Sequence, residues 1–149
     1  EIKLDGIYHD PDLKTQPHPA QISNTMVRKV STILSQIRWD QSHVARFLGK
    51  YLTEPKSSVF FDPPTRPLSL AKFAQRAKKT GVQLDLKSLM LFHADKFYLN
   101  GENIDASPAS INQLTRLADQ RALPPGEELA SELENLLYQW YCAGHIVLE

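Results

Sequence analysis

Two imidazoles and a carboxylate in this sequence could together bind a metal ion. His93 and Asp95 form a His-x-Asp pair, and His145 follows further along the chain. Two histidines and one carboxylate are the ligand set of non-haem iron oxygenases, which leave one face of the metal open. The spacing therefore raises the question of an iron site.

The residues around the His-x-Asp pair are more typical of a β-hairpin. Residues 88–92 and 96–100 have the character of short strands, with a tight turn at 94–96 between them. Asp95 then lies in the turn, where aspartate is common because its carboxylate binds nearby backbone amides, and His93 lies at a strand end. An oxygenase would also need a barrel of about eight strands, which this chain does not offer. We interpret the stretch as a hairpin and expect no metal-binding residue here.

The remaining candidate residues do not indicate catalysis either. His9 and His18 lie in a proline-rich segment, which cannot hold metal ligands rigidly, and we expect His43 to be a surface or helix-cap residue. Nothing pairs Cys142 with a base, so we expect it to be a small buried hydrophobic residue. There is no Gly-rich phosphate loop, Gly-x-Ser-x-Gly motif or paired-cysteine zinc pattern. We therefore expect no catalytic residue and no cofactor in this chain, and a stand-alone enzyme is the least favoured hypothesis.

The composition is that of an ordinary globular protein. The chain has 149 residues, 42% of them hydrophobic and 23% charged, with a net charge of zero. That length suits one domain or two small ones, and no apolar run is long enough to span a membrane. One cysteine excludes an internal disulfide and suits a reducing compartment; with no signal-like leader, we expect a cytoplasmic protein. Because the sequence opens on Glu1, we expect a piece of a longer one.

The charges are unevenly distributed along the chain. Residues 66–96 hold seven Lys/Arg against two acids, a local charge of +5, whereas residues 97–149 hold two Arg against eight acids, a local charge of −6. Such asymmetry is typical of solvated faces of opposite sign, but it can also mark a basic patch that binds RNA or DNA. The sequence leaves open whether residues 66–96 bind RNA.

The first part of the chain is predicted to be an extended connector, residues 1–21, followed by two amphipathic helices. Ser23 or Asn24 can cap the first helix and Asp40 the second. The two apolar stripes cannot bury each other alone, so they need the rest of the chain or another subunit. The first stripe contains Ile22, Met26, Val30, Ile33 and Ile37, and the second contains Val44, Phe47, Leu48, Tyr51 and Leu52.

A proline-rich stretch, "TEPKSSVFFDPPTRP", is the best candidate boundary, and we place the division near residue 62. Beyond it we predict a helix that starts near Ser69 and is capped by Gly81, the hairpin, and an Asn-Gly turn before "ENI". A helix with Ser107 as N-cap and Pro108 at its first position follows, then a loop at "ALPPGEE", a last helix that ends at Gly144, and a final strand "HIVLE" that joins the hairpin sheet. The fold class is α+β, mainly α.

Several weak motifs in one order resemble a known family. They are "YHDPDL", "HPAQI", "VRKV", "FLGKYLTEP" and "DPP" in the first half, then "FYLNGENID", "LADQRAL" and "LLYQWYCAGHIVLE". Together they resemble the region after the catalytic barrel of bacterial JmjC-type ribosomal oxygenases, also called cupin-like ribosomal protein hydroxylases. The resemblance covers nearly the whole chain.

The resemblance implies a parent enzyme that uses Fe(II), 2-oxoglutarate and oxygen to hydroxylate an arginine of a ribosomal protein. Its iron ligands would lie in a JmjC/cupin domain upstream of this chain. Residues 22–62 would be a helical dimerisation region and residues 63–149 a winged-helix-like C-terminal domain with a short antiparallel sheet. The chain would then be a non-catalytic module with dimerisation and scaffold or substrate-approach roles.

The stripe of the first helix is the predicted homodimer interface, formed by Met26, Val30, Ile33 and Ile37. The alternative function is a winged-helix nucleic-acid-binding module. It is less favoured because the helix at 108–119 includes an acid, Asp119, and an acidic helix follows it, whereas a DNA reader presents basic and amide side chains. In addition, the predicted order is helix, hairpin, helix, helix, strand, whereas in the usual winged-helix order the hairpin wing follows the recognition helix.

Overall fold

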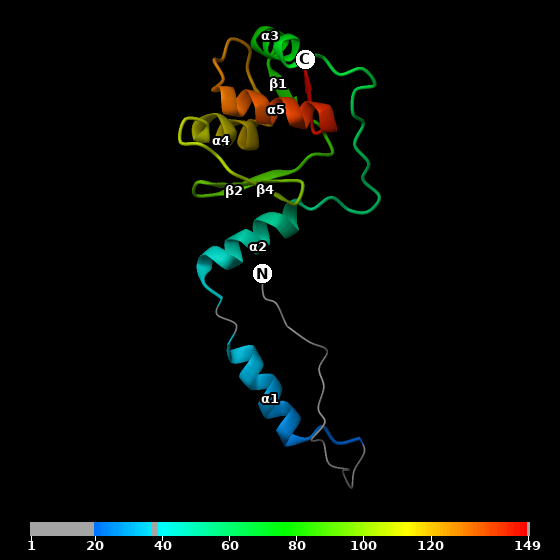
Figure 1. Ribbon diagram of the computed structural model, residues 1–149, viewed down its shortest axis with the longest axis vertical. Helices are drawn as coiled ribbons and strands as arrows, with labels where there is room; N and C mark the ends of the chain where they lie inside the picture. The colour runs from blue at the N-terminus through cyan, green and yellow to red at the C-terminus, as the bar shows by residue number, and fades with distance from the viewer. Residues whose placement is uncertain (1–19, 37–38, 149) are drawn as a thin grey trace. The chain divides into compact units, whose positions relative to one another are not determined.

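The computed structural model describes residues 20–36 and 39–148, and the chain divides into two compact units, Glu1–Trp39 and Asp40–Glu149. The helices are α1 (Asn24–Ser35), α2 (Gln41–Thr53), α3 (Leu70–Thr80), α4 (Ile111–Gln120) and α5 (Ser131–Ala143). The strands are β1 (Val82–Leu84), β2 (Met90–His93), β3 (Lys96–Leu99), β4 (Glu102–Ile104), β5 (Ala122–Leu123) and β6 (Ile146–Leu148). The predicted α+β, mainly helical class is confirmed (Figure 1).

Helix α1 is the described helix of the first unit. The Ser23 side chain accepts a hydrogen bond from the Met26 backbone N–H at 3.1 Å, so Ser23 is the N-cap, one of the two predicted candidates. None of the helix residues is buried. Its apolar side chains therefore lack a covering partner among the described residues of this unit.

Helix α2 opens the second unit and is capped by Asp40, as predicted. The Asp40 carboxylate accepts hydrogen bonds from the Ser42 hydroxyl at 2.7 Å and from the His43 backbone N–H and ring at 2.8 Å. These bonds hold the pKa of Asp40 well below its usual range, the Ser42 bond contributing most. His43 is exposed and bound to the cap, so its predicted surface or cap role is confirmed.

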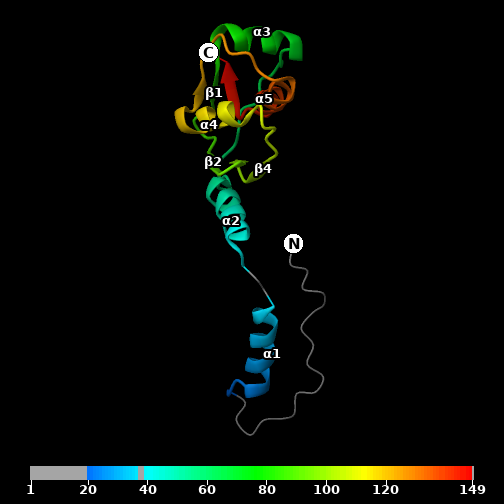
Figure 2. The same ribbon diagram turned by 90° about the vertical axis from the view of Figure 1, so that its left-hand side faces the viewer.

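The predicted hairpin is present and extends into a three-stranded antiparallel sheet in the order β2-β3-β4. Asn100 and Gly101 both have positive φ, 49° and 86°, which is the backbone of a tight two-residue hairpin turn. Figures 1 and 2 show this sheet between α2 on one side and α4 and α5 on the other. The Asn-Gly turn in the sequence therefore indicated correctly where β3 ends and β4 begins.

The chain contains a second sheet that the sequence did not predict. Strands β5, β1 and β6 pair in that order, all antiparallel, with Val82 opposite both Leu123 and Leu148. The prediction that "HIVLE" joins the hairpin sheet is therefore wrong. The Asn100–Gly101 turn already gives β3 a second neighbour, and the left-handed Gly144 at the end of α5 turns the chain back along β1.

The start of α4 also differs from the prediction. The helix begins at Ile111 rather than at Pro108, and Ser110, not Ser107, is its N-cap residue. Residues 108–110 form a turn in which the Ser110 N–H donates to the Ser107 carbonyl at 2.9 Å. Residues 108–110 therefore form a turn instead of the first turn of the helix. Serine residues near a helix start commonly favour such local hydrogen bonds over helical ones.

One hydrophobic core joins both sheets to α3, α4 and α5. Phe73 and Ala77 come from α3, where Gly81 forms the predicted C-cap by donating its N–H to the Ala77 carbonyl at 2.8 Å. The most deeply buried large side chains of the core are Phe73, Leu84, Phe97, Leu99, Leu114, Leu117, Leu133, Leu137 and Ile146.

The second unit begins at Asp40 and contains α2, which packs on β2, β3 and β4. The division into a connector (1–21), a dimerisation region (22–62) and a winged-helix-like C-terminal domain (63–149) stays a prediction. Residues 1–19 of the connector lie outside the described residues.

Candidate functional site

The structure separates the residues that suggested an iron site. His93 is exposed at the end of β2 opposite Lys96, and the exposed Asp95 carboxylate lies 3.3 Å from the Lys96 ammonium. His145 precedes β6 in the other sheet, and its ring packs edge-on against Phe61 at a centroid distance of 4.6 Å. Across residues 20–36 and 39–148, no three His, Cys, Asp or Glu side chains gather at metal-binding spacing.

Cys142 lies half-buried on α5 beside Tyr138. The hydrogen bond to Cys142, with some burial, raises the pKa of Tyr138. The Tyr138 hydroxyl donates to the Leu68 carbonyl at 2.9 Å, which ties the segment before α3 to α5. This corner of the domain is therefore organised for packing.

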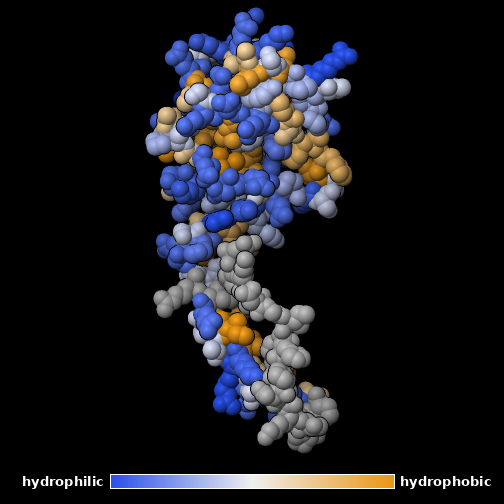
Figure 3. Space-filling view, in the orientation of Figure 1, coloured by the Kyte–Doolittle hydropathy of each residue, from blue (hydrophilic) through white to orange (hydrophobic). Residues whose placement is uncertain are grey.

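The candidate functional site is instead a pair of apolar helix surfaces. On α1, Val30 and Ile33 are each 40% exposed and Met26 is half-buried, while Ile37 lies outside the described residues. Figure 3 shows apolar side chains at the surface of α1 between polar ones. Val27 and Leu34, which sequence reasoning did not single out, widen this stripe because they are exposed on its flank. We name the exposed and half-buried apolar side chains of α1 the α1 stripe: Met26, Val27, Val30, Ile33 and Leu34.

Helix α2 also turns its large apolar side chains outward. Each is between 42% and 63% exposed within a helix that is otherwise docked on the second unit, and the rings of Phe47 and Tyr51 stack at 5.5 Å. We name this set the α2 stripe: Val44, Phe47, Leu48, Tyr51 and Leu52.

The face by which α2 docks on the sheet consists of small residues. Gly49 is buried so closely against Tyr98 of β3 that a Cβ at this position would lie within 3.0 Å of the ring. The Thr53 hydroxyl donates to the Gly49 carbonyl at 2.7 Å and accepts from the Gly101 N–H at 2.9 Å. The backbone of α2 therefore packs closely against the β2-β3-β4 sheet, and the large side chains of the helix remain exposed to solvent. The spacing of Ala45, Gly49 and Thr53, four residues apart, was the signal for this face in the sequence.

Helix α5 lacks the charges that a nucleic-acid reader needs. In a helix-turn-helix protein the second helix enters the major groove and its side chains reach the bases. Here α5 follows α4, carries Glu132 and Glu134 in its first turn, and contains no Lys or Arg. Phosphate contacts along this helix would be repulsive.

Three helices, α3, α4 and α5, packed on a small antiparallel sheet define this part of the chain as a winged-helix type of domain. The family model described as the ROXA-like winged helix matches residues 36–146. The chain belongs to the ROXA-like winged-helix family. The resemblance noted from the sequence is thereby confirmed.

A curated relative is the Escherichia coli (strain K12) protein named "Ribosomal protein uL16 3-hydroxylase". It is 24% identical over 100 residues, which are 66% of this chain and 27% of that protein. The chain therefore spans little more than a quarter of this relative.

Solved structures of an Escherichia coli ribosomal oxygenase, YcfD, have the same fold. One superposes with a TM-score of 0.66 at 24% identity and covers 97% of this chain and 41% of YcfD. Another, with cobalt and 2-oxoglutarate, has a TM-score of 0.67 at 23% identity. At these identities the likeness establishes the fold. Within the described part of the chain, no helix is both long and apolar enough to cross a bilayer.

Proposed function

We propose that this chain is the non-catalytic C-terminal part of a protein resembling a ribosomal protein hydroxylase, and that it forms the homodimer of that protein. In this proposal α1 and α2 assemble two subunits, and the winged-helix domain is a scaffold that shapes the approach of a ribosomal protein substrate. Support comes from the family membership and from relatives of which the chain matches only a part.

One observation carries the dimer proposal, namely the exposure of an apolar helix surface in each of the two units. Full burial of a Val, Leu, Ile, Phe or Met side chain contributes about 1.5–3 kcal/mol. The α1 stripe and the α2 stripe together expose large side chains of this kind on both helices. A stable interface buries about 800 Å² on each partner, and each stripe can contribute apolar surface to such an interface.

The chemistry of the parent protein is proposed to reside upstream, in a JmjC/cupin domain. One relative was solved with cobalt and 2-oxoglutarate, and the described residues of this chain hold no cluster that fits a metal ion. We therefore derive no chemical step within this chain. Fe(II) and 2-oxoglutarate, the hydroxylation of a ribosomal arginine, and a cytoplasmic location belong to the proposal for the whole protein.

The proposal is tested with a pair of charge variants on opposite sides of α1. Val30→Glu places a carboxylate in the α1 stripe, where dimer formation would have to desolvate it. Thr32→Glu adds the same charge to the same helix on its polar side and serves as the matched control. Sedimentation velocity should show a dimer for the wild type and Thr32→Glu and a monomer for Val30→Glu. Equal sedimentation of both variants would count against the α1 stripe as the interface.

A further inference from the structure

A groove of about 670 Å³ runs along α3 on its solvent side. The side chains that line it are Leu68, Lys72, Gln75, Arg76, Lys79 and Thr80. Residues three and four apart lie on one face of a helix, so the cations at positions 72, 76 and 79 form a single row. The buried residues of α3, Phe73 and Ala77, lie on another side of the helix. We name the row the α3 basic row: Lys72, Arg76 and Lys79.

The seven basic residues of the segment 66–96 divide into two groups. Three have a carboxylate within 3.4 Å, in the pairs Lys78–Glu128, Lys87–Asp62 and Lys96–Asp95. Within residues 20–36 and 39–148, the other four form no ion pair: Arg66, Lys72, Arg76 and Lys79. Three of these four line the groove, and the sequence of α3 contains no acid. The positive charge without an internal partner is therefore concentrated on this side of α3.

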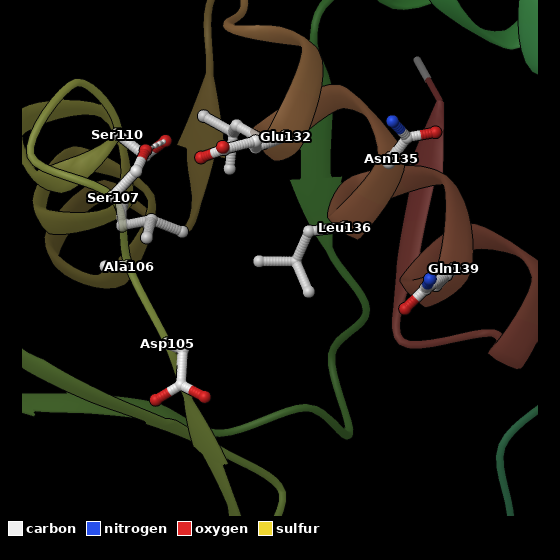
Figure 4. A pocket seen from close by; sticks show the side chains of 10 residues that line it. Asp105, Ala106, Ser107, Ser110, Glu132, Asn135, Leu136 and Gln139 are labelled. Atoms are coloured by element: carbon white, nitrogen blue, oxygen red, sulfur yellow. Dashed lines mark hydrogen bonds between the residues drawn. The ribbon is translucent and has the colours of Figure 1, made fainter.

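Acidic residues gather at a different surface of the second unit. Figure 4 shows a hollow beside α5 with the carboxylates of Asp105 and Glu132, and its described lining residues include no Lys or Arg. Helix α5 also carries Glu134 and has no basic residue in its sequence. A polyanion would be repelled from this surface and attracted to α3.

The residue types of the groove favour phosphates over the carboxylates of an acidic protein. Centres of protein–protein interfaces are enriched in aromatic residues and depleted of Lys. Here two of the three cations are lysines, and none of the described residues that line the groove is aromatic. Phosphate and sugar groups are contacted by Arg and Lys and by polar side chains such as Thr and Gln, and Gln75 and Thr80 lie beside the cations.

We propose that the α3 basic row binds the phosphate backbone of duplex RNA. At about 1.5 Å per residue the row extends over about 10 Å of the helix axis, so its three cations can contact successive phosphates. Duplex RNA is recognised mostly through its shape, its phosphates and its 2′-hydroxyls, so no side chain has to read a base. The Thr80 hydroxyl donates to the Arg76 carbonyl at 3.1 Å, and its oxygen can still accept from a 2′-hydroxyl.

The choice of RNA over DNA rests on the proposed function, because a ribosomal protein substrate would be found beside ribosomal RNA. The binding surface itself is separate from the α2 stripe. Figures 1 and 2 show α3 and α2 at opposite ends of the second unit. RNA binding and assembly through α2 can therefore be measured independently.

The proposal is tested by fluorescence anisotropy of a short labelled RNA duplex titrated with the full chain. Three phosphate contacts predict that the affinity falls by roughly 40-fold between 50 and 200 mM salt. A DNA duplex of the same sequence and polyglutamate should both bind more weakly than the RNA. No RNA binding at 50 mM salt, or binding that does not depend on salt, would overturn the proposal. DNA bound as tightly as RNA would overturn the assignment to RNA, and polyglutamate bound as tightly would show an acidic-protein surface instead.

Two triple variants with the same net charge locate the site. One removes the α3 basic row, and it is Lys72→Gln/Arg76→Gln/Lys79→Gln. The control removes the three cations of the same segment that have carboxylate partners, and it is Lys78→Gln/Lys87→Gln/Lys96→Gln. All six side chains are exposed, so we expect both variants to fold.

The first variant should weaken RNA binding by about 3- to 100-fold, the range of three exposed ion pairs, and the control should leave it nearly unchanged. Equal weakening by both variants would show general electrostatics and overturn the assignment to α3. Sedimentation velocity of the same variants should match that of the wild type. A failure of RNA binding is thereby distinguished from a failure of the proposed dimer.

Discussion

Gly49 shows how one residue without a side chain decides the position of a helix. It lies in the middle of α2, where glycine costs about 1 kcal/mol relative to alanine. The structure explains the choice, because the Tyr98 ring occupies the space that a Cβ would need. The hydrophobic pattern of α2 predicts the opposite docking face, since pattern analysis weights large side chains and ignores close backbone approach.

Gly49→Ala is expected to destabilise the second unit by about 1–2 kcal/mol, because overpacking costs about 1–3 kcal/mol and the gain in helix propensity offsets only part of it. Urea unfolding followed by circular dichroism measures the change. If alanine stabilised the protein by the amount that helix propensity alone predicts, the close contact with Tyr98 would be refuted.

His145 gives the fold a pH dependence. Its Nδ1 is buried without a hydrogen-bond partner in the described residues, and burial lowers its pKa, an effect that the Asp85 carboxylate only partly opposes. The unfolded chain therefore binds a proton more readily than the folded one. Stability contributed by the neutral ring is present above the unfolded pKa, about 6.5, and is lost as the pH falls below it.

We expect the free energy of unfolding to fall between pH 7.5 and pH 5.5, and His145→Phe, which keeps a ring against Phe61, to reduce that fall. Urea unfolding of both proteins at the two pH values measures the difference. An identical pH dependence in the variant would show that His145 does not titrate differently in the two states.

At the scale of elements, one side of α2 stabilises the fold of the second unit, and we propose that its other side contributes to the dimer. The Thr53 side binds the turn at Gly101, whereas the Leu48 side belongs to the α2 stripe and is exposed. A substitution on one side of this helix should therefore change the free energy of unfolding, and a substitution on the other side should change the dimer dissociation constant.

Thr53→Val should destabilise the second unit by about 1–3 kcal/mol, because it leaves the half-buried Gly101 N–H without its acceptor, while the dimer dissociation constant stays unchanged. Leu48→Glu should leave the unfolding free energy of the second unit nearly unchanged but weaken the dimer. Chemical unfolding and sedimentation measure the two quantities separately. The division of roles would be wrong if Leu48→Glu mainly lowered stability or Thr53→Val mainly weakened association.

Elements with a strong local signal were predictable from the sequence. The helices have apolar periodicity and capping residues, and the β2–β4 sheet has an Asn-Gly turn. Strands β1 and β5, of three and two residues, are too short for any period to appear, and only the tertiary pairing of Val82 and Leu123 forms them.

At the scale of the whole molecule, the chain combines a winged-helix fold with a charge distribution unsuited to reading DNA. The acids of α5 occupy the helix that would meet the major groove, whereas α3, an earlier helix, carries four basic residues: Lys72, Arg76, Lys78 and Lys79. What the chain offers prominently is apolar helix surface. Assembly between subunits is therefore the role that we propose for this surface.

The most direct test is the molar mass of the wild-type chain in solution. Multi-angle light scattering at tens of micromolar and high salt measures it without any variant. We expect twice the mass of one chain, and we expect that mass to persist in salt because apolar burial is not screened as ion pairs are. The mass of a single chain under these conditions would contradict the proposed homodimer.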